Sequence, residues 1–317
     1  MQIVLSGALP DPAEARELIR YMQDTAPTLC RWLSTYQARE HTVDPAQSLC
    51  TPAEHYQLQQ ASFKAEHAGH ISAGLAPLLL QQEKKRTDYQ ADEKIWLAQL
   101  VHIAPARDGA MLIPARELGI SAAESHALLR DFAPFSDDSP FTFKPCTTEH
   151  WQIQVPPEFT TPSASPELVA MSSVNDWWSQ DQRGRPWRQL ANEFQMFCFN
   201  HPINQSRQQE GRLSINSLWL YGGASLSQLP ATMDTDNTLY LPSLQASFLS
   251  RDWGDWLQQL KALEQSVFAP RADLVPEKLV LLGRDRYRVC QPAPSKIWPL
   301  RLFQKPQPWS RWWSPLS

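Results

Sequence analysis

The chain has 317 residues, 42% of them hydrophobic, and a formal net charge of −4. This length allows one large domain or two modest ones, each with its own core. A slightly acidic chain has no general attraction to nucleic acid or anionic lipid, since both partners demand clustered Lys and Arg. The composition therefore disfavours a dedicated nucleic-acid-binding role.

The amino-terminal and apolar segments give no sign of a membrane protein. The longest uncharged apolar run, residues 71–80, is well short of the ~20 residues that span a bilayer. Residues 1–10 contain no basic segment, and Asp11 and Glu14 follow, unlike a signal peptide. We expect a cytoplasmic protein without membrane contact.

The cysteines do not form a recognisable framework. Their number is odd and no C-x-x-C spacing occurs, which argues against disulfides and a structural zinc site. We expect free, mostly buried thiols at Cys30, Cys50, Cys146, Cys198 and Cys290. The 13 Trp and 27 Pro against 11 Gly indicate fixed loops and many aromatic contacts.

The first ninety residues predict one strand followed by helices. Residues 2–5 read as a short buried strand, and a helical pattern starts near Ala13 and is broken or restarted at Pro27. Residues 51–85 predict helices on the outside of the fold. The polar run 81–88 is typical of a solvated helix end or loop and is the best candidate linker.

Residues 91–157 predict a small α+β lobe. Ser121 and Glu124 form a capping box at the start of a helix, and an Asp-Gly pair at 108–109 favours a tight reversal. Strands are expected at 96–103, 110–113, 141–143 and 151–155. The Pro-rich segment 156–166 ends the lobe as an extended connection.

The later part of the chain alternates helices and strands. A helix is expected at 186–200, and another is capped by Asp252. Strands are expected at 215–221, 239–241, 278–282 and 287–290, with Gly222-Gly223 as a loop. Such alternation predicts an α/β fold with a mixed sheet flanked by helices.

These elements predict five parts of the chain. The main α/β core and the amino-terminal part belong together, and the small lobe lies between them in sequence. The divisions are 1–90 (part of the core), 91–157 (small lobe), 158–185 (Pro/Ser-rich connection), 186–303 (main core) and 304–317 (Trp/Pro-rich tail).

Two runs in the main core carry a resemblance to a known family. Residues 192–207 (NEFQMFCFNHPINQSR), Gly211 and residues 216–223 (NSLWLYGG) look like the signature of the RpfE-type regulatory family, whose members are often labelled phosphoglycerate-mutase-related. The match covers most of the chain in order, since it extends to 96–108, 121–135 and 297–298. It implies a bacterial regulatory protein.

The same runs are similar to archaeal-type cofactor-independent phosphoglycerate mutases of the alkaline phosphatase superfamily. Their two-metal phosphoryl chemistry needs several Asp and His ligands. Ser6 stands where the first metal-binding Asp is expected, and Asp285 lies between arginines where an Asp-His pair is expected. The resemblance therefore implies a degenerate core without catalytic residues, metal or other cofactor. The alternative is a phosphoryl-transfer enzyme, mutase or phosphatase, that uses divalent Mn or Zn.

Six residues around the helix-to-strand connection at 200–216 are the candidate ligand-binding site: Glu193, His201, Asn204, Arg207, Asn216 and Trp219. In the functional interpretation Arg207 pairs with an anion, the two Asn orient it, and Trp219 forms a wall. In the structural alternative these side chains satisfy buried carbonyls and Trp219 belongs to the core. His201 could be a general acid or base, or structural.

Three other features have weaker functional interpretations. His67 and His70 could bind metal on one helix face, but no third ligand is evident. Ser6 lacks the flanking glycines of a nucleophile elbow. Gly222-Gly223 could cradle phosphate, although a tight turn fits better.

The Trp-rich tail leaves a third function open. Residues 298–313 combine Trp with Arg and Lys, so they could stack single-stranded bases or meet a protein partner, or pack back on the domain as a strap. The sequence thus predicts a regulatory protein with a small anionic ligand or a protein partner, and leaves an enzyme and an interaction module as alternatives.

Overall fold

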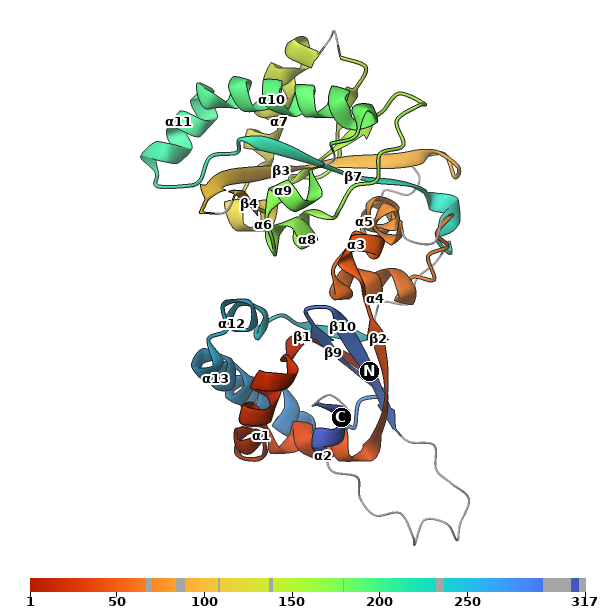
Figure 1. Ribbon diagram of the computed structural model, residues 1–317, viewed down its shortest axis with the longest axis vertical. Coiled ribbons are helices and arrows are strands. Elements are labelled where there is room, and N and C mark those ends of the chain that lie inside the picture. Colours follow the sequence, from red (N-terminus) through yellow and green to blue (C-terminus); the bar gives the residue numbers. More distant parts are fainter. Residues whose placement is uncertain are drawn as a thin grey trace, which may run out of the picture. The chain divides into compact units, whose positions relative to one another are not determined.

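The computed structural model describes residues 1–66, 70–83, 89–107, 109–136, 139–178, 180–231, 237–292 and 309–313. The chain forms two compact units (Figure 1). The terminal unit combines Met1–Val43 with Met233–Ser317, and the central unit is Asp44–Thr232.

The terminal unit is built on a five-stranded mixed sheet. Its strands are β1 (Gln2–Leu9), β2 (Tyr36–Thr42), β8 (Thr238–Leu241), β9 (Lys278–Gly283) and β10 (Arg286–Pro292), in the order β2-β10-β9-β1-β8. β1 is parallel to β8 and β9, whereas β10 is antiparallel to β9 and β2. The predicted α/β class with a mixed sheet flanked by helices is confirmed.

Helices supply the other half of the terminal unit's core. They are α1 (Pro12–Thr25), α2 (Pro27–Thr35), α12 (Gln245–Ser250) and α13 (Trp253–Leu263), followed by a π-helical turn (Glu264–Phe268) and 3-10 turns at Ala269–Arg271 and Trp309–Trp312. Leu18 and Met22 of α1 pack with Trp256 of α13 and with Trp313 in one cluster. The Trp313 indole is buried and donates a hydrogen bond of 2.9 Å to the Ala8 carbonyl. This part of the tail therefore packs on its own domain.

The central unit has an antiparallel sheet around the long strand β3. The strands are β3 (Lys94–Ala106), β4 (Gly109–Ile113), β5 (Thr142–Pro145), β6 (His150–Gln154) and β7 (Ser217–Ser225). Their order is β4-β3-β6-β5, and β7 pairs with β3 from Val101 opposite Ser217 to Lys94 opposite Ser225. β7 thus joins the predicted small lobe.

Helices cover both faces of this sheet. They are α3 (Pro45–Ser48), α4 (Pro52–Gln60), α5 (Leu75–Gln82), α6 (Ala115–Leu118), α7 (Ala122–Phe132), α8 (Pro166–Ala170), α9 (Val174–Trp177), α10 (Arg185–Phe199) and α11 (Pro202–Gln209), with 3-10 turns at Ile71–Gly74, Ala133–Ser136, Gln182–Gly184 and Leu226–Gln228. Leu220 packs with α7 and α10, whereas its neighbour Trp219 packs with α8 and α9. Figure 1 shows these two pairs of helices on opposite faces of the sheet. This alternation follows from the two-residue period of a strand.

The units divide the chain at other places than the sequence predicted. The predicted core 186–303 is split, because residues 217–225 pair with β3 and not with the terminal sheet. The predicted segment 1–90 is split after Val43. Its part up to β2 belongs to the terminal unit, because β2 pairs with β10, and the rest belongs to the central unit. The alternation of side chains predicts which residues of a strand face the core, but it does not identify the strand with which it pairs.

Three local predictions need correction or stay untested. Gly222 and Gly223 are not in a turn: they lie within β7, where Gly223 is an extra residue between the pairs Trp96–Gly222 and Ile95–Ala224. Helix α5 is not an outer helix, because Ala76 and most of its other side chains are buried. Strand β2 was not predicted at all. Asp108 of the expected reversal lies outside the described residues.

The structure also bears on the predicted free cysteines and on the search for membrane-spanning helices. All five cysteines are free and buried, as predicted. Among the described residues, no helix combines the length and apolar character needed to cross a bilayer.

The β7 bulge supplies a test of this arrangement. Gly222 has a φ of 117°, and an added Cβ would lie 2.5 Å from the Ile95 carbonyl oxygen and 2.8 Å from the Ala76 Cβ. We expect Gly222→Ala to lower the free energy of unfolding by ~3 kcal/mol or more in urea titrations, because backbone strain and a clash add up.

Gly211 is the matched control in the same unit. Its φ is 71°, and among the described residues no atom lies within 4 Å of an added Cβ. Gly211→Ala should therefore show only the left-handed backbone cost of about 1–2 kcal/mol. Equal effects of the two substitutions would contradict the close approach of β7 to β3 and α5.

Candidate functional site

The six predicted ligand-binding residues all lie in the central unit but do not surround one opening. His201 caps α11 and accepts from the Ile203 N–H. Its Nε2 lies 3.3 Å from Asp131. Glu193 is exposed on α10. The structure brings His201, Asn204 and Arg207 together on and around α11 and separates them from Glu193.

Arg207 is completely buried and its guanidinium is engaged by the protein. It donates to the Glu124 carboxylate (2.8 Å) and to the carbonyls of Leu118 and Leu213. Arg212 also reaches Glu124, at 3.1 Å. A ligand anion at Arg207 would have to displace Glu124.

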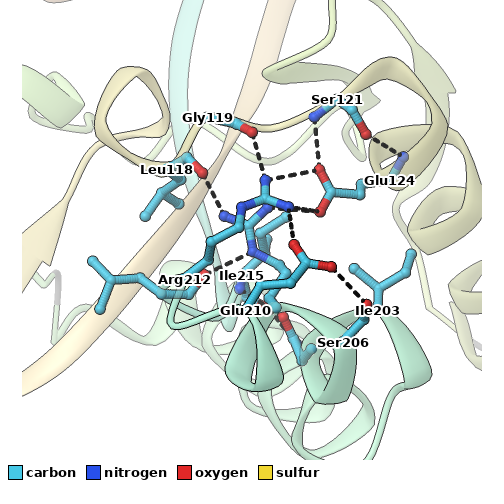
Figure 2. A network of polar contacts seen from close by, with 12 residues as sticks. Leu118, Gly119, Ser121, Glu124, Ile203, Ser206, Glu210, Arg212 and Ile215 are labelled. Carbon is cyan, nitrogen blue, oxygen red and sulfur yellow. Dashed lines mark hydrogen bonds and ion pairs between the residues drawn. The ribbon is translucent and has the colours of Figure 1, made fainter.

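Glu124 connects this network to the start of α7. Figure 2 shows Glu124 beside Arg212, with the Ser121 backbone N–H donating to the carboxylate at 2.7 Å. Burial alone would raise the pKa of Glu124, but the hydrogen bonds from Ser121 and Arg207 outweigh it and lower the pKa to about 2. The carboxylate is therefore ionised and neutralises the buried arginine.

The two asparagines satisfy backbone groups at both ends of the 200–216 connection. Asn204 donates to the carbonyls of Cys198 and Ile215 and accepts from the Ile215 N–H. Asn216 exchanges hydrogen bonds with the N–H and carbonyl of Ile103. These contacts agree with the structural alternative, and ligand binding by the six residues stays a prediction.

A cavity of about 360 Å³ lies elsewhere in the central unit. It opens where the β7 bulge faces the start of β3, so Gly222 and Gly223 form part of its wall. Its charged and polar lining includes Glu66, His70, Ser72, Lys94, Thr160, Ser163, Arg183 and Gln228, and its aromatic lining is Phe63, Trp96 and Phe159. Among the six predicted residues, none lines it.

Lys94 and Arg183 carry the positive charge of this cavity. Lys94 Nζ lies 3.5 Å from Glu66, and both side chains are more than half exposed. Arg183 donates to Asp181 at 3.0 Å and to the Thr160 hydroxyl at 3.4 Å. The sequence did not predict this site, because its members come from segments that no local pattern connects.

Two carboxylates of the terminal unit are engaged by the protein. Asp285, which stands where the resemblance expects an Asp-His pair, pairs with Arg286 at 2.9 Å. Asp252 accepts from the Asp255 N–H as the cap of α13, as the sequence predicted. Throughout the described ranges, no group of three or more His, Cys, Asp or Glu side chains is arranged to hold a metal ion. His67 lies outside the described residues.

Comparison with known proteins finds only distant similarity. No protein-family model and no curated protein matches the chain. Among solved structures, the chain is similar to the cofactor-independent phosphoglycerate mutase of Thermoplasma acidophilum, with 12% identity, 91% of this chain and 88% of the other covered, and a TM-score of 0.34. It is also similar to the PH0037 protein of Pyrococcus horikoshii, with 11% identity, 93% and 87% covered, and a TM-score of 0.45.

One further carboxylate has an unusual environment. Glu54 belongs to the capping box of α4, and its Oε2 accepts from the Thr51 N–H (2.8 Å) and from the hydroxyl of Ser165, the cap of α8 (2.6 Å). Burial raises the pKa of Glu54 to about 7, although these hydrogen bonds act in the opposite direction. Glu54 thus joins two helix starts with a carboxyl group that titrates near neutrality.

Removing Glu124 tests the buried ion pair. Glu124→Ala leaves Arg207 buried without a counter-charge, so we expect a loss of about 3–5 kcal/mol in the free energy of unfolding. The control Glu117→Ala removes a more exposed carboxylate that pairs with Arg116, and should change stability by less than ~1 kcal/mol. Adding Arg207→Met to Glu124→Ala should recover part of the loss. An unchanged stability of Glu124→Ala would refute the structural role of the pair.

Glu54 should make stability depend on pH in a definite direction. Because its pKa is higher in the folded than in the unfolded chain, its stabilising effect is complete below about pH 4.5 and is lost as the pH rises through about 7. Glu54→Gln should remove this dependence, so the variant gains about 2–3 kcal/mol relative to the parent protein between pH 4 and 8.

Urea titrations across this pH range measure the effect. The control Glu193→Gln changes an exposed carboxylate on α10 and should follow the parent profile. Parallel profiles for Glu54→Gln and the parent would show that Glu54 has an ordinary pKa.

Proposed function

We propose that the protein is a non-catalytic regulatory protein of the RpfE type that binds a small anionic ligand in the 360 Å³ cavity of the central unit. The observation that carries this proposal is the meeting of Lys94 and Arg183 at one cavity with aromatic walls. A cavity of this volume is typical of small-molecule sites, which combine apolar walls with a few polar groups.

The cations of the cavity are available to a ligand. An exposed ion pair such as Lys94–Glu66 contributes little free energy, so an incoming anion can take the place of Glu66. Arg183 donates from Nε to Asp181 and from Nη1 to Thr160, and its five N–H groups leave further donors. Together they suit a carboxylate or phosphate group.

The walls favour a ligand that carries more than a bare anion. Trp96 and Phe159 meet edge to face, with 5.3 Å between their ring centroids. Gly222 and Gly223 place the backbone of the bulge in the cavity wall, and bulges are frequent beside binding sites. Phe63, which is partly exposed, completes an aromatic side of the cavity.

The predicted cluster around Arg207 has a supporting part in this proposal. Asn204 and Arg207 fix the chain just before β7, and β7 carries the two glycines into the cavity wall. The family resemblance supports the regulatory, cytoplasmic and non-catalytic parts of the proposal.

Anion binding is tested by isothermal titration calorimetry with inorganic phosphate and with 3-phosphoglycerate. We expect 3-phosphoglycerate to bind, and Lys94→Ala and Arg183→Ala each to weaken it at least ~10-fold, because each removes one charge-assisted contact. Lys144→Ala changes an exposed lysine of the same unit outside the cavity and should bind as the parent does. Absence of binding, or equal binding by all variants, would refute the site.

The non-catalytic part is tested by elemental mass spectrometry together with phosphatase and mutase assays in added Mn. We expect no turnover. Turnover that a chelator abolishes would overturn this part and favour the phosphoryl-transfer alternative.

The interaction-module alternative has less support. Within the described stretch of the tail, residues 309–313, Trp313 is buried and so offers no ring to a partner.

A further inference from the structure

An open pocket of about 200 Å³ lies in the central unit between α9, α10 and the start of β7. Its polar lining consists of three carboxamides, those of Asn175, Asn192 and Gln195, and of the hydroxyl of Ser217. The described residues that line it include no charged side chain. The pocket therefore differs in chemistry from the 360 Å³ cavity, with which it shares no lining residue.

The polar groups of this pocket are available to a ligand. Among the described residues, the carboxamides of Asn175, Asn192 and Gln195 have no hydrogen-bond partner. Ser217 is only 4% exposed, but its hydroxyl is not one of the described polar atoms that the protein encloses without a partner. A ligand can therefore bond these groups without first breaking a contact within the protein.

The fold fixes the position of the pocket walls. Asn192 and Gln195 are three residues apart on α10, so their side chains lie on the same face of the helix. Asn216 exchanges hydrogen bonds of 2.7 and 3.0 Å with the backbone of Ile103, and these bonds hold Ile103 of β3 beside the start of β7. Ile103 and Ser217 both line the pocket, so Asn216 supports its floor.

Trp178 supplies the aromatic wall of the pocket. Its ring lies 5.4 Å from the ring of Trp219 between centroids, and Trp219 is held by a hydrogen bond of 2.8 Å to the Ala164 carbonyl. Trp178 itself is partly exposed. The indole is thus supported by the core of the unit, and a planar ligand can stack on its accessible part.

Two asparagines of the same unit show which partner suits a carboxamide. Asn204 bonds both the N–H and the carbonyl of Ile215, and Asn216 does the same with Ile103. A ligand of the unoccupied carboxamides should likewise present a donor beside an acceptor. Adenine does so on both sides of its amino group, and Asn and Gln are the side chains that bind it in this bidentate way.

We propose that this pocket binds the base of an uncharged adenine nucleoside. The ring stacks on Trp178, and the carboxamides of α9 and α10 bond the amino group and its neighbouring ring nitrogens. The volume is below the about 300–1,000 Å³ of drug-sized sites, so the pocket takes a base and leaves the sugar in solvent.

The lining argues against other classes of ligand. A phosphate or carboxylate would meet no cation, since Arg188, the last cation of α10 before Asn192, does not line the pocket and donates to the Asp181 carbonyl at 2.9 Å. An aliphatic group would remove water from three carboxamides and return no hydrogen bond. A free sugar could bond the carboxamides but has no planar ring to stack on Trp178.

The test is a titration of the full chain with adenosine, followed by saturation-transfer NMR. We expect binding in the millimolar range, and binding of N6,N6-dimethyladenosine and of glucose at least ~10-fold more weakly, because neither presents the donor and acceptor of the adenine amino edge. Asn192→Leu and Gln195→Met keep the approximate size of each side chain but remove its carboxamide. Each should weaken adenosine binding ~10-fold, which is the order of discrimination of one bidentate contact.

Controls separate this site from the anion site. Gln189→Met changes an exposed amide of α10 outside the pocket and should bind adenosine as the parent does. Lys94→Ala and an excess of inorganic phosphate should also leave adenosine binding unchanged. The proposal does not depend on the function of Lys94 and Arg183, so loss of 3-phosphoglycerate binding alone would leave it intact.

Four results would each overturn the proposal. They are no binding of adenosine, equal binding by the parent, Asn192→Leu and Gln195→Met, binding of glucose or N6,N6-dimethyladenosine as tight as that of adenosine, and competition by phosphate, which would assign adenosine to the 360 Å³ cavity.

Discussion

The pairing of β7 with β3 is the constraint on which the central unit depends. It continues from Val101 opposite Ser217 to the bulge at Gly223, and it fixes which side chains of β7 face each helix layer. Trp219 packs with α8 and α9. Further along β7, the lack of side chains at Gly222 and Gly223 leaves room for the side chain of Ala76 and the ring of Trp96. Gly222, Gly223 and Ala224 of this strand line the 360 Å³ cavity, so the backbone hydrogen bonds of the pair position part of its wall.

A buried charge is neutralised beside the segment that leads into β7. Arg207 cannot be buried alone, and Glu124 supplies its counter-charge while also capping α7. The other donors of Arg207 bind the carbonyl of Leu118 and that of Leu213, which lies in the segment leading to β7. Glu124, which the sequence identified as part of a helix capping box, therefore also connects α7, α11 and the segment before β7 through Arg207.

Local signals predicted local structure, and long-range pairing was beyond them. The Ser121–Glu124 capping box forms as expected, and the strands around β3 and β6 lie close to the predicted ranges, because caps and alternation act over a few residues. The partner of Arg207 is 83 residues away, and no spacing in the sequence identifies it. Lys94 and Arg183 were missed for the same reason: each is an ordinary surface cation until the fold places both at one cavity.

The runs that carry the family resemblance hold the backbone of the candidate site in place. Asn204 and Arg207 bind backbone groups before β7, whereas the Trp-Leu-Tyr-Gly-Gly run in β7 supplies its two glycines to the wall of the 360 Å³ cavity. A sequence that must hold a buried arginine and admit a glycine bulge tolerates few substitutions, even if none of its polar groups touches a ligand. The residues that are conspicuous in the sequence can therefore build a site whose ligand contacts are made by less conspicuous neighbours such as Lys94 and Arg183.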